Sequence, residues 1–113
     1  METTFKLEIE ATSPCPKFLN ANLRDQVQKI KSEVLEVEEA LEEFLNWQEL
    51  GIEPTKASVK LLMEMFDVVA CVNTLNMQLN YHYPDCFSPQ RREEAEEAVI
   101  TKNIARGYYA PEV

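Results

Sequence analysis

The sequence predicts an all-α fold, a helical bundle that is completed by oligomerisation. Apolar residues recur at alternating steps of three and four positions, as on one face of an α-helix. The chain has only 2 glycines and few of the turn signals that separate β-strands. Its 113 residues suffice for one domain with a core, but not for two.

The first helix is expected from Leu23 to about Leu50. Residues 1–19 include two prolines and read as an irregular lead-in, so the helical domain is placed at 20–113. Asn20 or Asn22 can cap this helix, because an asparagine oxygen accepts from the free N–H groups of the first turn. Its apolar seam is formed by Val27, Ile30, Val34, Val37, Leu41 and Phe44.

A second helix follows a break at Gly51 to Pro54. It opens at Thr55 or Ser58 and runs to about Tyr81. Roughly 27 helical residues extend about 40 Å, which is longer than a small monomeric domain needs. The length therefore suggests a partner chain.

Ser88 is expected to begin a third helix that runs from Arg91 to about Ala105. Gly107 is well placed to end it, since glycine adopts the left-handed conformation common after a helix. The chain shows no internal repeat and no low-complexity segment.

The composition excludes several function classes. Lys and Arg number 11 against 20 Asp and Glu, and a net charge of −9 disfavours binding to a nucleic-acid polymer. The three cysteines, without a Cys-x-x-Cys pair, argue against a disulfide framework and a zinc ribbon. We see neither a signal peptide nor a membrane span, so a cytoplasmic location is the expectation.

The most informative feature is a pair of acids, Glu64 and Asp67, inside an apolar run from Leu61 to Val72. Three residues are about one helical turn, so both carboxylates point to the same side of the helix. The other positions are apolar nearly all round, which predicts a helix buried on most sides. A buried carboxylate without a partner is costly, and it neutralises, pairs with a cation or binds a metal.

Glu33 and Glu36 repeat this spacing on the first helix, and alone they would read as solvated surface acids. For Glu64 and Asp67 the ordinary alternative is a buried salt bridge, which we disfavour because the apolar run holds no basic residue. If the helices pack antiparallel, the pairs face each other and four carboxylates repel. Mg²⁺, or Mn²⁺ in its place, would relieve the repulsion, and two ions can serve to activate water and to grip phosphate.

Together the pairs carry a family resemblance. The pattern Glu33-x-x-Glu36, 27 residues, then Glu64-x-x-Asp67 resembles that of the MazG-like, all-α nucleoside triphosphate pyrophosphatases, over roughly residues 20–109. The resemblance implies a MazG-like bundle and a Mg²⁺-dependent pyrophosphohydrolase that cleaves a nucleoside triphosphate to the monophosphate and pyrophosphate. It also implies that the four acids are catalytic metal ligands, and that one glutamate orients the attacking water.

The segment 102–108, Lys-Asn-Ile-Ala-Arg-Gly-Tyr, also resembles the basic segment that follows in this family. Lys102 and Arg106 lie four apart on one helix face, with Asn103 beside them, and can hold the triphosphate; otherwise they complement the helix C-terminus. One departure is Ser32, where the family often has a further acid.

Two aromatic residues are weaker candidates for contact with the base. Trp47 can stack on it, although a single Trp near a helix end more often makes a packing or dimer contact. Tyr108 can close over a ligand or pack against a partner subunit. Members of the resembled family assemble as dimers or tetramers, and the sequence chooses neither the oligomer nor the preferred base.

The acidic helices also suggest two other function classes. A di-iron bundle needs Glu-x-x-His pairs, and the only histidine, His82, does not follow a glutamate at that spacing. The remaining alternative is a non-catalytic acidic helical-bundle oligomer that acts as a protein-interaction module.

Overall fold

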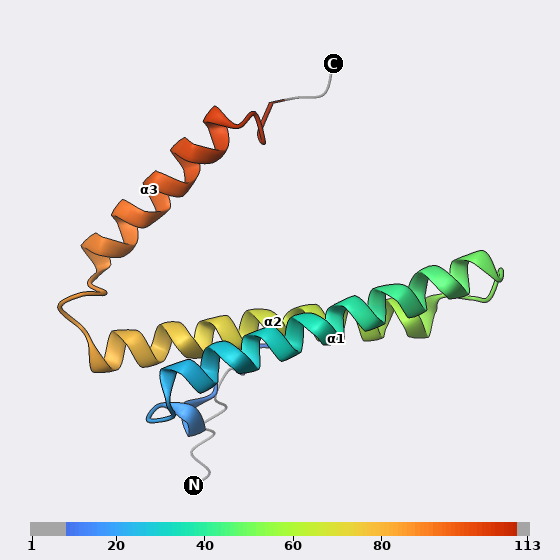
Figure 1. The fold of residues 1–113 in the computed structure, drawn as a ribbon, viewed down its shortest axis with the longest axis horizontal. Coiled ribbons are helices and arrows are strands. Elements are labelled where there is room, and N and C mark those ends of the chain that lie inside the picture. Colours follow the sequence, from blue (N-terminus) through green and yellow to red (C-terminus); the bar gives the residue numbers. More distant parts are fainter. Residues whose placement is uncertain (1–8, 111–113) are drawn as a thin grey trace, which may run out of the picture. The chain divides into compact units, whose positions relative to one another are not determined.

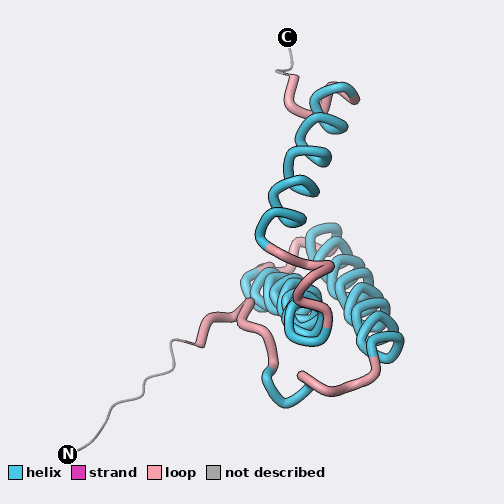
Figure 2. The backbone as a smooth tube through the Cα atoms, turned by 90° about the vertical axis from the view of Figure 1, so that its left-hand side faces the viewer, coloured by secondary structure: helices cyan, strands magenta, loops and turns pink. Residues whose placement is uncertain are grey.

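A computed structural model describes residues 9–110 of the chain. It holds three α-helices, α1 (Leu23–Glu49), α2 (Thr55–His82) and α3 (Pro89–Ala105), after a short 3-10 turn, η1 (Pro16–Phe18) (Figure 1). Over the described range the backbone consists of helices and loops, without a strand (Figure 2). The predicted all-α class is confirmed. Residues 1–8 of the expected lead-in and 111–113 of the expected domain lie outside this range.

The helix boundaries follow from local signals. The Asn22 side chain accepts from the backbone N–H groups of Arg24 and Asp25, so this asparagine caps α1 rather than Asn20. After α1 the chain turns at Gly51, whose φ of +66° is readily adopted only by glycine. α2 then begins at Thr55, the earlier of the two predicted starts.

α1 and α2 form an antiparallel hairpin and lie side by side (Figures 1 and 2). Near one end, Gln26 Nε2 donates to the carbonyl of Cys71 at 2.9 Å. Toward the other end, Lys60 Nζ lies 3.2 Å from Glu43 Oε2. These contacts set the register in which the two acidic pairs meet.

The centre of the hairpin is lined by small and polar side chains. Its buried residues on α1 and α2 are Gln26, Ala40, Ala57, Cys71, Thr74 and Gln78. The expectation that α2 is buried on most sides is wrong for the single chain, since Met63 is 58% and Phe66 46% exposed. A hairpin of two helices covers only one face of each, and the other apolar faces stay open.

The segment before α1 is docked on α2 through its backbone. Asn73 Nδ2 donates to the carbonyl of Thr12 at 2.7 Å, and the N–H of Cys15 donates to Thr74 Oγ1 at 3.0 Å. The described part of the predicted lead-in is therefore held by specific polar contacts, although most of it is not helical.

The chain divides into two compact units, one up to Gln78 and the other from Leu79 onward. In the second unit the Ser88 side chain caps α3 by accepting from the N–H of Arg91, so Ser88 begins this helix as predicted. Gly107 follows the helix with a φ of +76°, which also agrees with the prediction.

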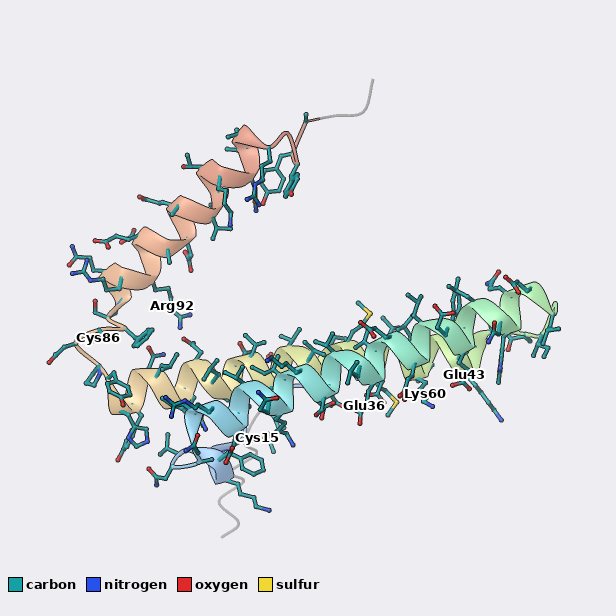
Figure 3. All side chains as sticks on the ribbon, viewed as in Figure 1. Cys15, Glu36, Glu43, Lys60, Cys86 and Arg92 are labelled. Carbon is teal, nitrogen blue, oxygen red and sulfur yellow. The ribbon has the colours of Figure 1, made fainter. Side chains whose placement is uncertain are left out.

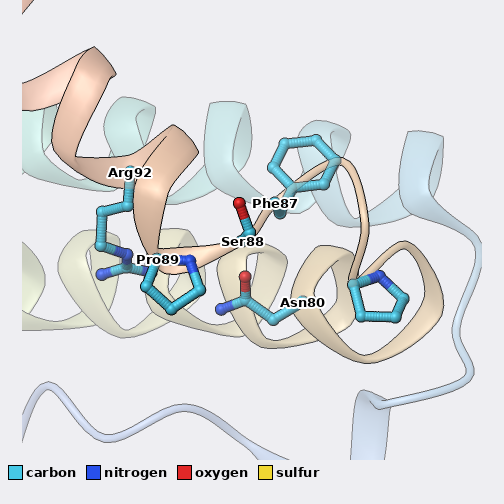
Figure 4. Close-up of a pocket in the computed structure, with 6 residues that line it drawn as sticks. Asn80, Phe87, Ser88, Pro89 and Arg92 are labelled. Atoms are coloured by element: carbon cyan, nitrogen blue, oxygen red, sulfur yellow. The ribbon is translucent and has the colours of Figure 1, made fainter.

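The second unit has a hollow of about 360 Å³ at the start of α3. Its lining contains Arg92 but no acidic residue (Figure 4). It is formed by Asn80, Pro84, Phe87, Ser88, Pro89 and Arg92. Among the described helices, none has both the length and the apolar character needed to cross a membrane.

Candidate metal centre

Three carboxylates from the two helices of the hairpin meet at one point. Glu33 of α1 and Glu64 and Asp67 of α2 each offer an oxygen, and these oxygens all lie within 4.8 Å of one another. The antiparallel pairing places the first acidic pair opposite the second. The structure therefore brings together three of the four acids expected to act as ligands.

Two of the oxygens in this cluster are buried without a hydrogen-bond donor. Glu33 Oε2 and Glu64 Oε2 have almost no exposed surface, and no described group donates to them. Desolvating an anionic oxygen without supplying a donor or a cation is costly. A cation among these oxygens would remove that cost.

The electrostatics of the cluster are those of acids crowded together. Partial burial raises the pKa of Glu33 above its ordinary value of 4.5, and the neighbouring carboxyl groups of Glu36 and Asp67 raise it further. The pKa of Glu64 is raised by burial and by the same neighbours. Lys29 opposes the shift at Glu33, and Lys60 opposes it at Glu64.

Glu36 is the fourth acid and lies at the edge of the cluster. It is exposed on α1 (Figure 3). Its carboxylate is close enough to raise the pKa of both Glu33 and Glu64, but it is not one of the three that meet within 4.8 Å. It can join a cation from the solvent side.

The donor set suits a hard divalent cation. All four groups are carboxylates, the ligands that Mg²⁺ and Mn²⁺ accept, and no histidine or cysteine belongs to the cluster of three. Mg²⁺ keeps several waters, so three carboxylates on a partly open surface leave positions for a phosphate ligand.

The chain matches no protein-family model, no curated protein and no solved structure with which it was compared.

The other predicted site residues lie elsewhere in the chain. Lys102, Asn103 and Arg106 belong to the second unit, on α3 and at its C-terminal end. There the Arg106 guanidinium lies 5.8 Å from the ring centroid of Tyr108. Trp47 is in the first unit, half-buried near the end of α1 and about 17 Å along the helix from Glu36.

Sequence reasoning overlooked a short repeat around the site. Lys29-x3-Glu33-x2-Glu36 on α1 has the same form as Lys60-x3-Glu64-x2-Asp67 on α2. On antiparallel helices a shared pattern gives the cluster approximate two-fold symmetry, with a lysine one turn before each motif. A search for matched spacing, rather than for repeated structural units, would have found both lysines.

Proposed function

We propose that this protein is a divalent-metal-dependent nucleoside triphosphate pyrophosphohydrolase. The observation that carries the proposal is the meeting of Glu33, Glu64 and Asp67 with two buried, donor-free carboxylate oxygens. The motif that these residues share with MazG-like proteins supports the same reaction. Water and the triphosphate would yield the nucleoside monophosphate and pyrophosphate.

The chain's own residues would supply binding and orientation. Glu33, Glu64 and Asp67 would hold Mg²⁺ or Mn²⁺, and Glu36 would complete the ligand set at the exposed edge. The bound ion would supply neutralisation of phosphate charge, which is most of what phosphoryl transfer requires. One glutamate oxygen not engaged with the ion would accept a proton from the attacking water.

We also propose that the hairpin functions as a homodimer or homotetramer. The single chain leaves apolar side chains of α2 about half exposed, including Met63, Phe66 and Val69. Exposed apolar surface of this kind often marks a protein–protein interface. A second hairpin of the same chain would cover it, as in a four-helix bundle.

The direct test is pyrophosphate release from a panel of nucleoside triphosphates with Mg²⁺. The wild type should release pyrophosphate, Glu64→Gln should abolish release, and EDTA should do the same. Glu39→Gln is the matched control, because it removes one negative charge from an exposed position of α1 outside the cluster. The panel would also identify the preferred base.

Failure of every nucleotide with a folded wild-type protein would refute the catalytic proposal. The same apolar and acidic faces would then favour a non-catalytic oligomer that binds partner proteins. Such a module needs no metal, so its melting temperature should be equal in Mg²⁺ and in a sodium salt of the same ionic strength.

A further inference from the structure

The two lysines that precede the acidic motifs have different surroundings. Lys60 is neutralised by Glu43, with 3.2 Å between Nζ and Oε2 (Figure 3). Lys29 forms no ion pair of 4 Å or less with any acid in the described part of the chain. Its ammonium group instead lies 5.3 Å from the ring centroid of Phe18. The approximate symmetry of the cluster is thus broken by its cations.

The Phe18 ring also lies near the ammonium group of a second lysine, Lys17. Lys17 Nζ lies 5.6 Å from the centroid of the same ring. An aromatic ring attracts an ammonium group, but two like charges near one ring also repel each other. Two positive charges held near one ring also strengthen the attraction for an anion at this end of the hairpin.

The position of Phe18 is fixed from α2. Gln78 is fully buried, and its Nε2 donates to the Phe18 carbonyl at 2.7 Å. This bond, over 60 residues of sequence, holds η1 on the hairpin. Lys17 and the Phe18 ring are therefore carried by an element that is held on the hairpin, and Lys29 is carried by α1 itself.

Lys29 also lies close enough to the cluster to act on its ligands. It precedes Glu33 by four residues, so both point to one side of α1. Its positive charge lowers the pKa of Glu33 and of the Cys71 thiol, opposing the effect of burial on each. The unneutralised cation thus sits at the α1 N-terminal side of the carboxylates.

We propose that Lys29, supported by the charge of Lys17 near the same Phe18 ring, binds the terminal phosphates of the nucleotide. This deepens the proposed function and rests on it. The two acidic motifs match in their spacing, but their lysines differ, since Lys60 is paired with Glu43 and Lys29 is not, so the cations give the site a direction. The phosphate tail then points toward η1, and the nucleoside lies toward the side of Lys60, whose charge is already taken by Glu43.

The test measures binding of inorganic pyrophosphate in Mg²⁺ by calorimetry. Lys29→Gln should weaken binding about tenfold, the loss expected for one charge-assisted hydrogen bond. Lys60→Gln is the matched control, with the same charge change, the same spacing from a motif glutamate, and an expected loss below about twofold. Lys29→Arg should restore binding, and Phe18→Leu should weaken it in the same direction as Lys29→Gln.

In steady-state hydrolysis, Lys29→Gln should raise KM for the nucleotide and leave the melting temperature unchanged. Equal losses of pyrophosphate affinity in the two glutamine variants would overturn the inference, because they would reflect net charge alone. Absence of pyrophosphate binding by the wild type would overturn it as well. Pyrophosphate binding that depends on Lys29, without any nucleotide hydrolysis, would uphold this anion site and refute only the proposed reaction.

Discussion

Replacing Glu33 by Gln should change stability in opposite directions without and with metal. The substitution keeps the size of the side chain and removes one charge from three oxygens that lie within 4.8 Å. At that separation two unit charges repel by about 0.9 kcal/mol in water, and by more where water is partly excluded. Two such neighbours make the metal-free variant more stable than the wild type by about 1 to 2 kcal/mol at pH 8.

Metal should reverse the order of the two proteins. If Mg²⁺ binds as proposed, a concentration of 100 times its Kd would stabilise the wild type by about 2.7 kcal/mol, which exceeds the gain from removing the charge. The variant lacks one ligand and should respond much less. Without metal, the melting temperature of Glu33→Gln should therefore be about 5 to 10 °C above that of the wild type, and in excess Mg²⁺ it should be lower.

Differential scanning fluorimetry at constant ionic strength measures both effects. Glu39→Gln serves as the control for the change in net charge, since it lies outside the cluster and should shift little in either buffer. The reasoning would be refuted if metal-free Glu33→Gln melts at a lower temperature than the wild type and if Mg²⁺ leaves the melting temperature of the wild type unchanged. The acids would then be stabilised by contacts within the protein.

Three further predictions follow from single features. The pKa values of Glu33 and Glu64 are raised above 4.5, so just above that pH the folded state binds more protons than the unfolded state. The free energy of unfolding of the metal-free protein should therefore fall as pH rises through this window. Urea titrations at several pH values measure this change. Gly51→Ala should lower the free energy of unfolding by about 1 kcal/mol, measured in urea, because φ is +66° although a Cβ would meet no atom within 4 Å. Gln78→Leu removes the donor to the Phe18 carbonyl, so trypsin should cut after Lys17 faster than in the wild type, and an unchanged rate would contradict the docking of η1.

Local signals were sufficient to predict the helices. Side-chain caps and positive-φ glycines act within a few residues of a helix end, so Asn22, Ser88 and Gly107 could be recognised from the sequence. The periodicity of α1 also predicted one packed apolar seam, and this is wrong for the single chain: Val27, Val34 and Leu41 are each about 40% exposed, and the buried residues of α1 are Gln26 and Ala40. The acidic pairs could be placed opposite each other because an antiparallel hairpin leaves few alternatives for two motifs near the middle of adjoining helices.

Long-range polar contacts could not be predicted in this way. Thr74 accepts a hydrogen bond from one backbone N–H, and Gln78 donates one to a backbone carbonyl, in each case about 60 residues away in the sequence. Every residue type has these backbone groups, so such a partner leaves no sequence pattern. The different surroundings of Lys29 and Lys60 could not be predicted from the sequence either. Their spacing is identical, and only the folded contacts with Phe18 and Glu43 distinguish them.

The buried amide groups of the hairpin can be compared with the buried carboxylate oxygens of the acidic cluster. For two buried amide N–H groups the chain provides an acceptor: Gln26 Nε2 and Gln78 Nε2 both donate to backbone carbonyls. A third orphan atom, Gln78 Oε1, belongs to a neutral group whose other end is bonded. The two orphan carboxylate oxygens carry charge, lie in one cluster, and face further acids rather than donors. Buried carboxylate oxygens that face other acids carry a desolvation cost that a neutral amide oxygen does not, and this difference is why the metal proposal rests on Glu33 and Glu64.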